Sequence, residues 1–292
     1  MRPILFATCL EQPAYQPSDA LAAAALEARG ASVRAVPWNG PADAFVDEAA
    51  IVVRSTWDYA RAGAEFAGWL DGLSARPHVF NPPALMLWNL SKRYLEELQE
   101  AGVVLPPTRF APPTRAAVDA AIDALGVDEA VVKPAIDAGA EGLSRVRRGD
   151  DTAAAVEKLR GADALVQAYV PAIATLGETS FIFIGGAYSH AIAKSPKAGD
   201  IRVQEEHGGV SVRAEARGFA VDEARRIVRL IEDRAGAPAL YARVDAIVDG
   251  ESAMLDERFR LMEVELIEPD LFFHVAPDGA ERFADALLAQ LS

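Results

Sequence analysis

Two alternating runs late in the chain place the strongest constraint on its fold. Residues 242–248 and 259–267 each alternate apolar and polar side chains, and a polar connector containing Asp249-Gly250 separates them. Alternation is the period of a β-strand, and two such runs joined by a turn-forming segment indicate neighbouring strands. The sequence therefore predicts a sheet in the last quarter of the chain.

The two predicted strands carry charged side chains at regular spacing. Arg243 and Asp245 are two residues apart, as are Glu263 and Glu265, so each pair shares one face of its strand. If the strands are adjacent, three carboxylates and one guanidinium converge. Such carboxylates repel one another unless a cation lies among them, and hard oxygen ligands suit Mg²⁺. A solvated sheet face with scattered charges is the alternative interpretation.

Composition excludes several classes of function. The formal charge of −14 argues against a nucleic-acid surface. No apolar stretch reaches the roughly 18–20 residues that a membrane-spanning helix needs. The single cysteine, Cys9, cannot form an internal disulfide, which fits a reducing compartment. We therefore expect a cytoplasmic protein that binds neither nucleic acid nor membrane.

The first part of the chain has the pattern of a parallel α/β sheet. Residues 3–9, 32–36 and 50–54 are predicted strands, and residues 18–29 an Ala/Leu-rich helix with Ser18 as its N-cap. Alternation of strands and helices gives a parallel sheet with covered faces.

In open sheets of this kind, ligands bind beyond the carboxyl ends of the strands. The third predicted strand ends there in a loop rich in donors, acceptors and aromatic rings, which suits an amino-acid-like ligand. The candidate substrate-binding residues of this loop are Arg54, Ser55, Thr56, Trp57 and Asp58. A helix start that Asp58 or Ser55 merely caps is the alternative.

Two lysines and a glycine loop in the middle of the chain are candidates for phosphate binding. Lys92 lies in the first turn of a helix predicted over residues 91–101, where a cation opposes the helix dipole and an anion partner would resolve the conflict. Lys133 lies in an apolar predicted strand. The loop that follows contains Gly139 and Gly142 and predicts a flap whose backbone N–H groups can close over phosphates, with a simple hairpin as the alternative.

Taken together, the elements resemble the ATP-grasp superfamily over essentially the whole chain. The order is an open α/β domain, a Lys-bearing helix (SKRYLEELQEAGVVLPPT), a strand Lys, a Gly/Ala flap, a hinge (VQAYV), and Asp and Glu on late strands. The resemblance implies an α/β fold, α+β in the C-terminal part, with an N-terminal open parallel sheet. The implied units are an N-terminal domain (1–88), a small subdomain (106–175), and a C-terminal subdomain (89–105 and 176–292).

The resemblance also implies roles for individual residues. Lys92 and Lys133 would meet the ATP phosphates, and Glu178 the ribose hydroxyls. The implied nucleotide-binding set is completed by Gly139, Glu141, Gly142, Gln167, Ala168, Tyr169, Val170 and Lys194. The implied magnesium ligands are Asp245 and Glu263, with Glu265 standing where many members have Asn. The implied catalytic, phosphate-stabilising residues are Arg202 and Arg243, and Gln204 and Gly208 join the substrate candidates.

Within the superfamily, the chain resembles glutathione-synthetase-like and RimK-like members, and more closely the cyclo-ligases of D-cycloserine biosynthesis. The shared segments are RSTWDY, GETSFIFI, SHAIAKSP, GDIRVQEEHGG and MEVELIEPDLFF. Where glutathione synthetases and RimK-like ligases have Asp-x-Arg after the hinge, this chain has Glu178-Thr179-Ser180.

This resemblance implies an ATP- and Mg²⁺-dependent carboxylate–amine ligase that works through an acyl phosphate on a small amino-acid-like carboxylate. One form of the activity is intramolecular closure, as of O-ureido-D-serine to cycloserine. Intermolecular ligation of the RimK or glutathione synthetase type, and a non-catalytic ATP-binding regulatory protein, are the alternatives. Related ligases are often dimers or tetramers, so a homo-oligomer stays open.

Overall fold

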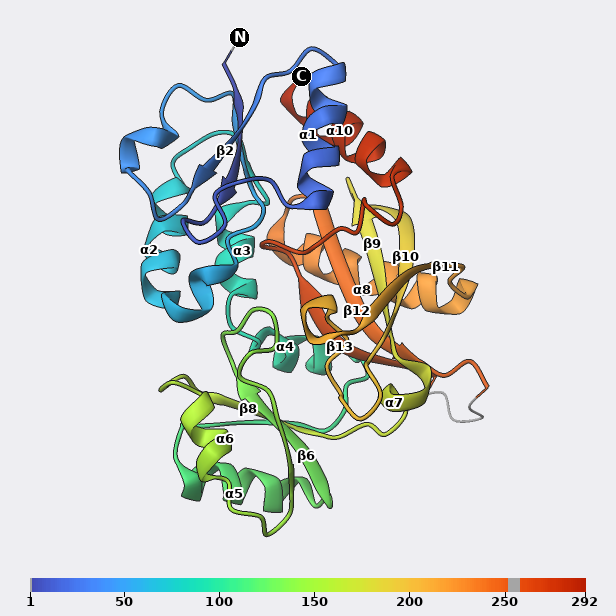
Figure 1. The fold of residues 1–292 in the computed structure, drawn as a ribbon. Coiled ribbons are helices and arrows are strands. Elements are labelled where there is room, and N and C mark those ends of the chain that lie inside the picture. The colour runs from blue at the N-terminus through green and yellow to red at the C-terminus, as the bar shows by residue number, and fades with distance from the viewer. Residues whose placement is uncertain (1, 252–257) are drawn as a thin grey trace.

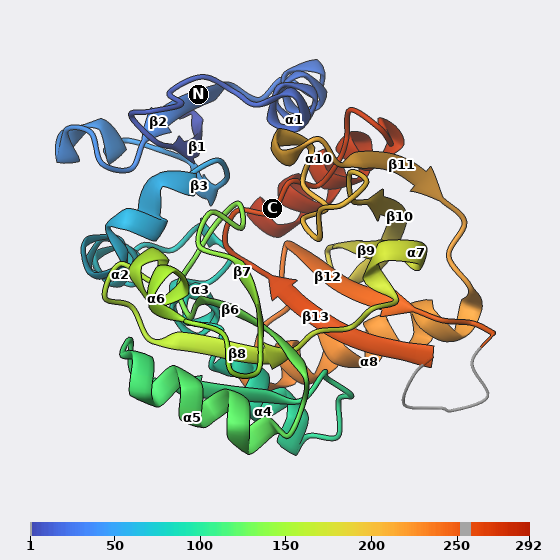
Figure 2. The same ribbon diagram turned by 60° about the horizontal axis from the view of Figure 1, so that its bottom comes forward.

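The computed structural model describes residues 2–251 and 258–292. Within these residues the strands form three sheets, which Figure 1 shows as a blue N-terminal unit, a green small unit and a yellow-to-red C-terminal unit. The blue and green units lie at opposite ends of one side of the C-terminal sheet in both Figure 1 and Figure 2. The predicted α/β class, with its mixed C-terminal part, is confirmed.

The N-terminal sheet is parallel throughout, in the order β2-β1-β3-β4. Its strands are β1 (Ile4–Thr8), β2 (Val33–Pro37), β3 (Ala50–Val53) and β4 (Val79–Phe80). The helical segments of this unit are α1 (Pro17–Ala28), η1 (Ala42–Phe45), η2 (Trp57–Arg61), α2 (Gly63–Leu73) and α3 (Pro83–Asn89). Because helices cover both faces, β1 and β3 are buried along their whole length and have continuous apolar sequences.

The predicted capping of the first helix is wrong. Helix α1 begins at Pro17, whose fixed φ suits the first helical position, and Gln16 occupies the N-cap without a side-chain bond. Ser18 is therefore inside the first turn. Its hydroxyl donates to Asp270 Oδ1 at 2.6 Å and accepts the N–H of Phe273 at 3.0 Å, so it fastens a distant loop instead of the helix start.

Lys92 also lies outside the helix that the sequence predicted. The helix α4 (Tyr94–Glu100) has Arg93 as its N-cap, and Lys92 belongs to the turn between α3 and α4. The Lys92 N–H donates to Ala135 O at 2.7 Å, which fastens this turn to the loop that follows Lys133. The helix-dipole argument for an anion partner therefore does not apply, and Lys92 must be judged by its side-chain contacts.

The small sheet is antiparallel, in the order β5-β8-β6-β7. Its strands are β5 (Thr108–Ala111), β6 (Glu129–Pro134), β7 (Ser144–Arg147) and β8 (Ala164–Ala168). Helices α5 (Arg115–Leu125) and α6 (Ala153–Lys158) pack on it through a core that includes Val118, Val132 and Val166. The opposite face packs Leu165 into the core of the C-terminal sheet and presents Val131 and Lys133 to a cavity.

The C-terminal sheet is antiparallel, in the order β11-β10-β9-β12-β13. Its strands are β9 (Glu178–Ile184), β10 (Ala187–Ser195), β11 (Val210–Ala214), β12 (Tyr241–Val248) and β13 (Phe259–Glu265). The remaining helical segments are α7 (Ile173–Leu176), η3 (Glu205–His207), α8 (Gly218–Ala235) and α10 (Asp278–Leu291). The predicted adjacency of the two late strands is confirmed, with Asp245 opposite Glu263 and Arg243 opposite Glu265.

One buried asparagine joins the N-terminal unit to this sheet. Asn81 donates from Nδ2 to Tyr241 O and Leu266 O, both at 2.8 Å, and accepts the Leu240 N–H at 2.7 Å. Asn81 is fully buried, so these bonds satisfy a side chain that would otherwise be costly to bury. They hold the carboxyl ends of the parallel strands against the end of β12 and β13. No helix among the described residues has both the length and the apolar character to cross a membrane.

Candidate active site

A cavity of about 630 Å³ lies between the three sheets. Its wall comes from the loops after β1 and β3, the β6–β7 loop, the end of β8, the face of β12 and β13, and the loop after β13. Polar and charged side chains line the part of the cavity along β12 and β13, and apolar ones line the part between the small and C-terminal sheets. A space of this size and chemistry suits a small molecule with phosphate groups.

Glu263 lies between the two predicted phosphate lysines. Lys92 Nζ is 2.8 Å from Glu263 Oε1, and Lys133 Nζ is 3.6 Å from Oε2. Burial by itself would raise the pKa of the Glu263 carboxyl, but the two lysines outweigh it and hold the pKa below the ordinary value. The Glu263 side chain is 24 % exposed, so the cluster opens to the cavity.

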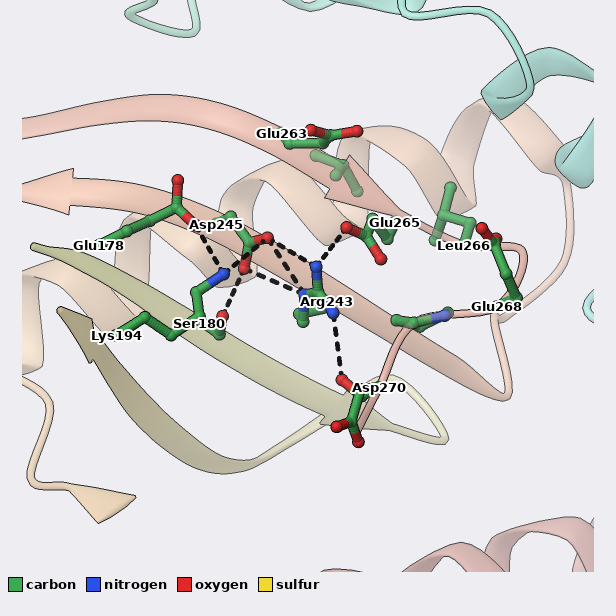
Figure 3. Close-up of polar contacts among 12 residues, drawn as sticks. Glu178, Ser180, Lys194, Arg243, Asp245, Glu263, Glu265, Leu266, Glu268 and Asp270 are labelled. Atoms are coloured by element: carbon green, nitrogen blue, oxygen red, sulfur yellow. Dashed lines mark hydrogen bonds and ion pairs between the residues drawn. The ribbon is translucent and has the colours of Figure 1, made fainter. Parts of the chain in front are cut away.

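Asp245 is the centre of a second charge cluster (Figure 3). Its carboxylate accepts hydrogen bonds from Ser180 Oγ at 2.5 Å and from the Arg243 guanidinium at 3.0–3.1 Å, and Lys194 Nζ is 3.2 Å away. Lys194 also pairs with Glu178 at 2.5 Å. Burial opposes ionisation, but Arg243 and Lys194 overcome it and lower the pKa of Asp245 to about 2. Asp245 is therefore ionised over the whole physiological range.

Glu265 differs from the other acids of the sheet. Arg243 pairs with it, yet burial together with Asp245 and Glu263 raises the pKa of Glu265 to about 8. The local positive charge is therefore insufficient for all three carboxylates. A further cation near Glu265 would lower its pKa and favour the ionised form.

These acids fit a magnesium ion in chemical type. Mg²⁺ prefers hard oxygen ligands and is usually held by one or two carboxylates together with substrate phosphates and water. The described residues contain no cluster of three or more acidic, His or Cys ligands placed to hold a metal alone. Asp245 and Glu263 present carboxylates on adjacent strands, and lysine and arginine nitrogens contact their oxygens. Magnesium binding by Asp245, Glu263 and Glu265 therefore stays a prediction.

The predicted flap is the loop between β6 and β7, which Figure 2 shows rising from the small sheet toward the N-terminal unit. Gly139 has φ +69°, a conformation that glycine tolerates, and its carbonyl accepts from His207 Nε2 at 3.0 Å. Glu141 pairs with Arg61 at 3.1 Å, so the loop is fastened to η2. Gly142 does not line the cavity: a Cβ there would lie 2.5 Å from the ring of Pro134.

The predicted hinge lines the cavity over its whole length, from Gln167 to Val170. Two of its amides are already engaged, because Ala168 N–H donates to Pro107 O at 2.8 Å and Tyr169 N–H to Glu129 O at 3.1 Å. Any reading of an adenine edge by the hinge therefore depends on other backbone groups. Apolar side chains surround this part of the cavity, namely Val131, Val170, Ile173, Val203, Ile247 and Met262.

The RSTWDY loop is mostly turned away from the cavity. Arg54 is 2 % exposed and forms a buried ion pair with Asp19 at 2.7 Å. Ser55 and Thr56 are fully buried behind the cavity wall, and Asp58 accepts from the side chains of Trp38 and Asn39. Of the five predicted residues only Trp57 lines the cavity. The sequence pattern could not show this, because Asp19, the partner that turns Arg54 inward, is on a different element.

The remaining predicted residues belong to the segment between β10 and β11. Arg202 and Gln204 line the cavity, and the Arg202 guanidinium pairs with Asp200 at 2.8 Å. Gln204 Oε1 is buried and has no hydrogen-bond partner within the described parts of the chain. Gly208 packs against Lys197 and does not line the cavity.

Sequence reasoning missed two parts of the cavity wall, one from the N-terminal unit and one from the loop after β13. Gln12, Gln16 and Ser18 follow β1, and Asp270 and His274 follow β13; all five line the cavity. The rule that ligands bind at the carboxyl ends of parallel strands applies to β1 as well as β3, and would have found the first three. Asp270 and His274 are in a loop without regular spacing, so only the tertiary structure reveals them.

Known proteins resemble this chain along nearly its whole length. Residues 4–81 match the family model described as the D-cycloserine synthetase DcsG N-terminal domain. The cycloserine biosynthesis protein DcsG of Streptomyces lavendulae is 30 % identical over 253 residues, which cover 83 % of each protein. The crystal structure of D-cycloserine synthetase DcsG matches with a TM-score of 0.86 and 27 % identity, over 99 % of both chains.

A more distant structure shares the fold alone. The D-alanine–D-alanine ligase of Bacillus anthracis complexed with ATP has a TM-score of 0.69 and 14 % identity, over 100 % of this chain and 97 % of that one. This chain therefore has the same fold as that ligase. Given the identity and coverage shared with DcsG, the chain belongs to the DcsG family of ATP-grasp enzymes, the ADP-forming carbon–nitrogen ligases.

Proposed function

We propose that this enzyme closes an O-ureido-serine-type amino acid onto itself and so forms cycloserine. The observation that carries the proposal is the match to D-cycloserine synthetase, which spans 99 % of both chains with a TM-score of 0.86. We further propose a cytoplasmic enzyme built as an N-terminal domain (1–88), a small subdomain (106–175) and a C-terminal subdomain (89–105 with 176–292).

The proposed reaction activates a carboxylate. The substrate carboxylate oxygen attacks the γ-phosphorus of ATP, and ADP leaves. The ureido nitrogen bonded to the side-chain oxygen then attacks the acyl phosphate carbon and expels phosphate. Cycloserine lacks the carbamoyl group of an O-ureido substrate, so the ureido C–N bond must also be hydrolysed, with release of carbamate. Because phosphoryl transfer depends on positioning and charge neutralisation, the enzyme's main task is to supply cations at fixed points.

The cations of the cavity fit that task. Lys92 and Lys133 would bind the phosphates, since both already contact a carboxylate oxygen of Glu263 that a phosphate oxygen can replace. Arg202 and Arg243 would neutralise charge on the transferred group. When bound by Asp245, Glu263 and Glu265, Mg²⁺ would supply Lewis-acid neutralisation of phosphate charge. The β6–β7 loop would exclude water, which otherwise hydrolyses the acyl phosphate.

The apolar part of the cavity would hold the purine. Val131 of the small sheet and Ile247 and Met262 of the C-terminal sheet face a common space beside the hinge. Glu178 is the candidate for the ribose hydroxyls. It lines the cavity, and its carboxylate pairs with Lys194.

The test is a single-substrate turnover assay. Purified enzyme with ATP, Mg²⁺ and O-ureido-D-serine should release ADP and yield cycloserine by mass spectrometry without any second amine. Lys133→Met should reduce turnover roughly 10- to 100-fold, as expected for loss of a charged hydrogen bond. The exposed Lys158→Met, outside the cavity lining, is the matched control.

Three other outcomes would contradict the proposal. A product that joins two molecules would favour a RimK-type ligase. Turnover of a different carboxylate alone would leave the ligase class intact and refute cycloserine formation. ATP binding without ADP release for any amino-acid-like carboxylate would favour a regulatory protein.

A further inference from the structure

The β6–β7 loop contacts the N-terminal unit as well as the cavity. Residues 137–141 and Leu143 of this loop line the cavity. Ile136 and Ala138 also pack against the apolar core of the N-terminal unit, and a Cβ on Gly63, at the start of α2, would lie 3.5 Å from Ile136 Cγ2. The position of the loop over the cavity therefore depends on a unit to which the loop does not belong.

One carboxylate of the loop joins two arginines from different units. Glu141 Oε1 is 3.1 Å from Arg61 Nη2 of η2. Glu141 Oε2 is 3.4 Å from Nη2 of Arg160, which follows α6 in the small unit. Arg61 is held from its other side as well, because its Nη1 donates to the two carboxylate oxygens of Glu11 at 3.0 and 3.3 Å. These four side chains connect the N-terminal unit, the loop and the small unit.

The C-terminal unit contributes a further contact at the tip of the loop. His207 Nε2 donates to Gly139 O at 3.0 Å, two residues before Glu141. Gly139 and Ala140 both have left-handed backbones, with φ of +69° and +56°. Glycine tolerates this conformation, but alanine disfavours it. Contacts on both sides thus hold Ala140 in a strained conformation, and such strain is common in ligand clamps and switch segments.

The ion pairs that hold the loop are weak, and the loop has space beside it. The side chains of Arg61, Glu141 and Arg160 are 50 %, 44 % and 59 % exposed. Exposed ion pairs contribute little free energy, so they break and form again readily. A second cavity, of about 390 Å³, lies between the loop, η2 and the end of α6, and its lining includes all three side chains. Opening of the loop therefore costs little and meets no packed core on this side.

Arg61 is separate from the active-site cavity. Trp57 and Tyr59 of the same η2 segment line that cavity, as does Glu141, but Arg61 does not. An effect of Arg61 on a bound nucleotide must therefore pass through the loop. This makes Arg61 a cleaner test of loop closure than Glu141, which lines the cavity itself.

We infer that the contact between Arg61 and Glu141 is a latch that holds the β6–β7 loop closed over the nucleotide, and that opening of this latch sets the rate at which ADP leaves. Arg61 is then a positioning residue of the N-terminal unit that acts through Glu141. A second consequence, that the closed latch protects the acyl phosphate from water, rests on the proposed carboxylate-activating function.

The experiment measures how fast ADP leaves the enzyme. A fluorescent ADP analogue bound with Mg²⁺ is displaced by excess ADP in a stopped-flow instrument, so no turnover is needed. Arg61→Met should raise the dissociation rate roughly 2- to 5-fold, the range expected for loss of one exposed ion pair. Glu141→Gln should raise it at least as much, because this change also weakens the contact with Arg160.

Three control variants distinguish a latch from a general loss of structure. Arg61→Lys keeps the charge and should restore most of the slow dissociation. Arg115→Met removes an exposed ion pair with Asp151, outside both cavities, and should leave dissociation unchanged. The double variant Arg61→Met with Glu141→Gln should match Glu141→Gln alone, because both changes break the same contact.

The outcomes separate the latch from the proposed function. Unchanged ADP dissociation in Arg61→Met would overturn the latch, and so would single effects that add in full in the double variant. With O-ureido-D-serine, the ADP released in excess of product should rise roughly 2- to 5-fold in Arg61→Met. Faster dissociation without that rise would overturn the protection of the acyl phosphate. Faster dissociation in the variant, with no turnover of O-ureido-D-serine by the parent, would refute cycloserine formation and support the latch.

Discussion

Replacing Arg54 by Met separates a structural role from a substrate-binding one. Arg54 and Asp19 are 2 % and 4 % exposed on their side chains and pair at 2.7 Å, and Arg54 also donates to Pro269 O at 2.8 Å. In Arg54→Met the Asp19 carboxylate stays buried without its partner. Loss of one member of such a pair costs about 3–5 kcal/mol in free energy of unfolding. At roughly 2 °C per kcal/mol for a chain of this size, Tm should fall by about 6–10 °C.

A double replacement provides the control. Asp19→Leu combined with Arg54→Met removes both charges, and exchange of a buried pair for apolar groups is often neutral. The double variant should therefore recover most of the lost stability in urea and thermal unfolding. A substrate-binding Arg54 predicts the opposite pattern: a raised KM, with a free energy of unfolding within about 1 kcal/mol of the parent's. If Arg54→Met unfolds like the parent, or if the double variant is no more stable than the single one, the structural argument is refuted.

Three further predictions concern the charge clusters and the flap. Arg202→Ala should lower turnover while the free energy of unfolding, measured in urea, changes by only about 0–1 kcal/mol. Arg243→Ala should also lower turnover but cost about 3–5 kcal/mol, because it leaves two buried acids without their arginine; equal stability of the two variants would contradict this. Without Mg²⁺, burial raises the pKa of Glu265 to about 8, above its value in the unfolded chain. The folded protein then binds this proton more tightly than the unfolded chain does. The contribution of Glu265 to stability should therefore be lost as pH rises from its unfolded pKa through about 8. Glu265→Gln should flatten that pH dependence in thermal unfolding, and an unchanged slope would count against it. Gly142→Ala should lower the free energy of unfolding by about 1–3 kcal/mol, because the added methyl group overpacks the ring of Pro134. Gly68→Ala, in a helix with open space around it, should not destabilise the protein. Similar unfolding curves for both variants would argue against the packing role of Gly142.

The sequence predicts the position of Arg243 but not its burial or its partners. Its position beside Asp245 on one strand follows from alternation, and a role at the phosphates follows from the resemblance. That the side chain is only 9 % exposed and serves two acids follows from the pairing of β12 with β13. The sequence therefore indicates a catalytic role for Arg243, and only the buried ion pairs of the structure indicate that its loss also costs stability.

The sequence alone determined the local elements and the faces of the late strands. Alternation over residues 242–248 and 259–267 was sufficient to place Asp245 and Glu263 each on a known face of its strand, because the side-chain period of a strand is fixed by its backbone. The register that brings Asp245 opposite Glu263 came from the structure. The parallel N-terminal sheet followed equally from its apolar strands and Ala-rich helix, whose patterns are local.

The tertiary structure decided which side chains meet the cavity. Arg54 turns away from it because Asp19 of α1 offers a buried partner, and Lys92 reaches Glu263 from a turn that Ala135 fastens. Asp270 is aimed by Ser18, about 250 residues away in the chain. Such choices depend on partners that are remote in sequence, and burial makes them decisive because an unpaired charge is costly there and cheap in water. Local pattern contains no information about those partners, so only the assembled fold could select them.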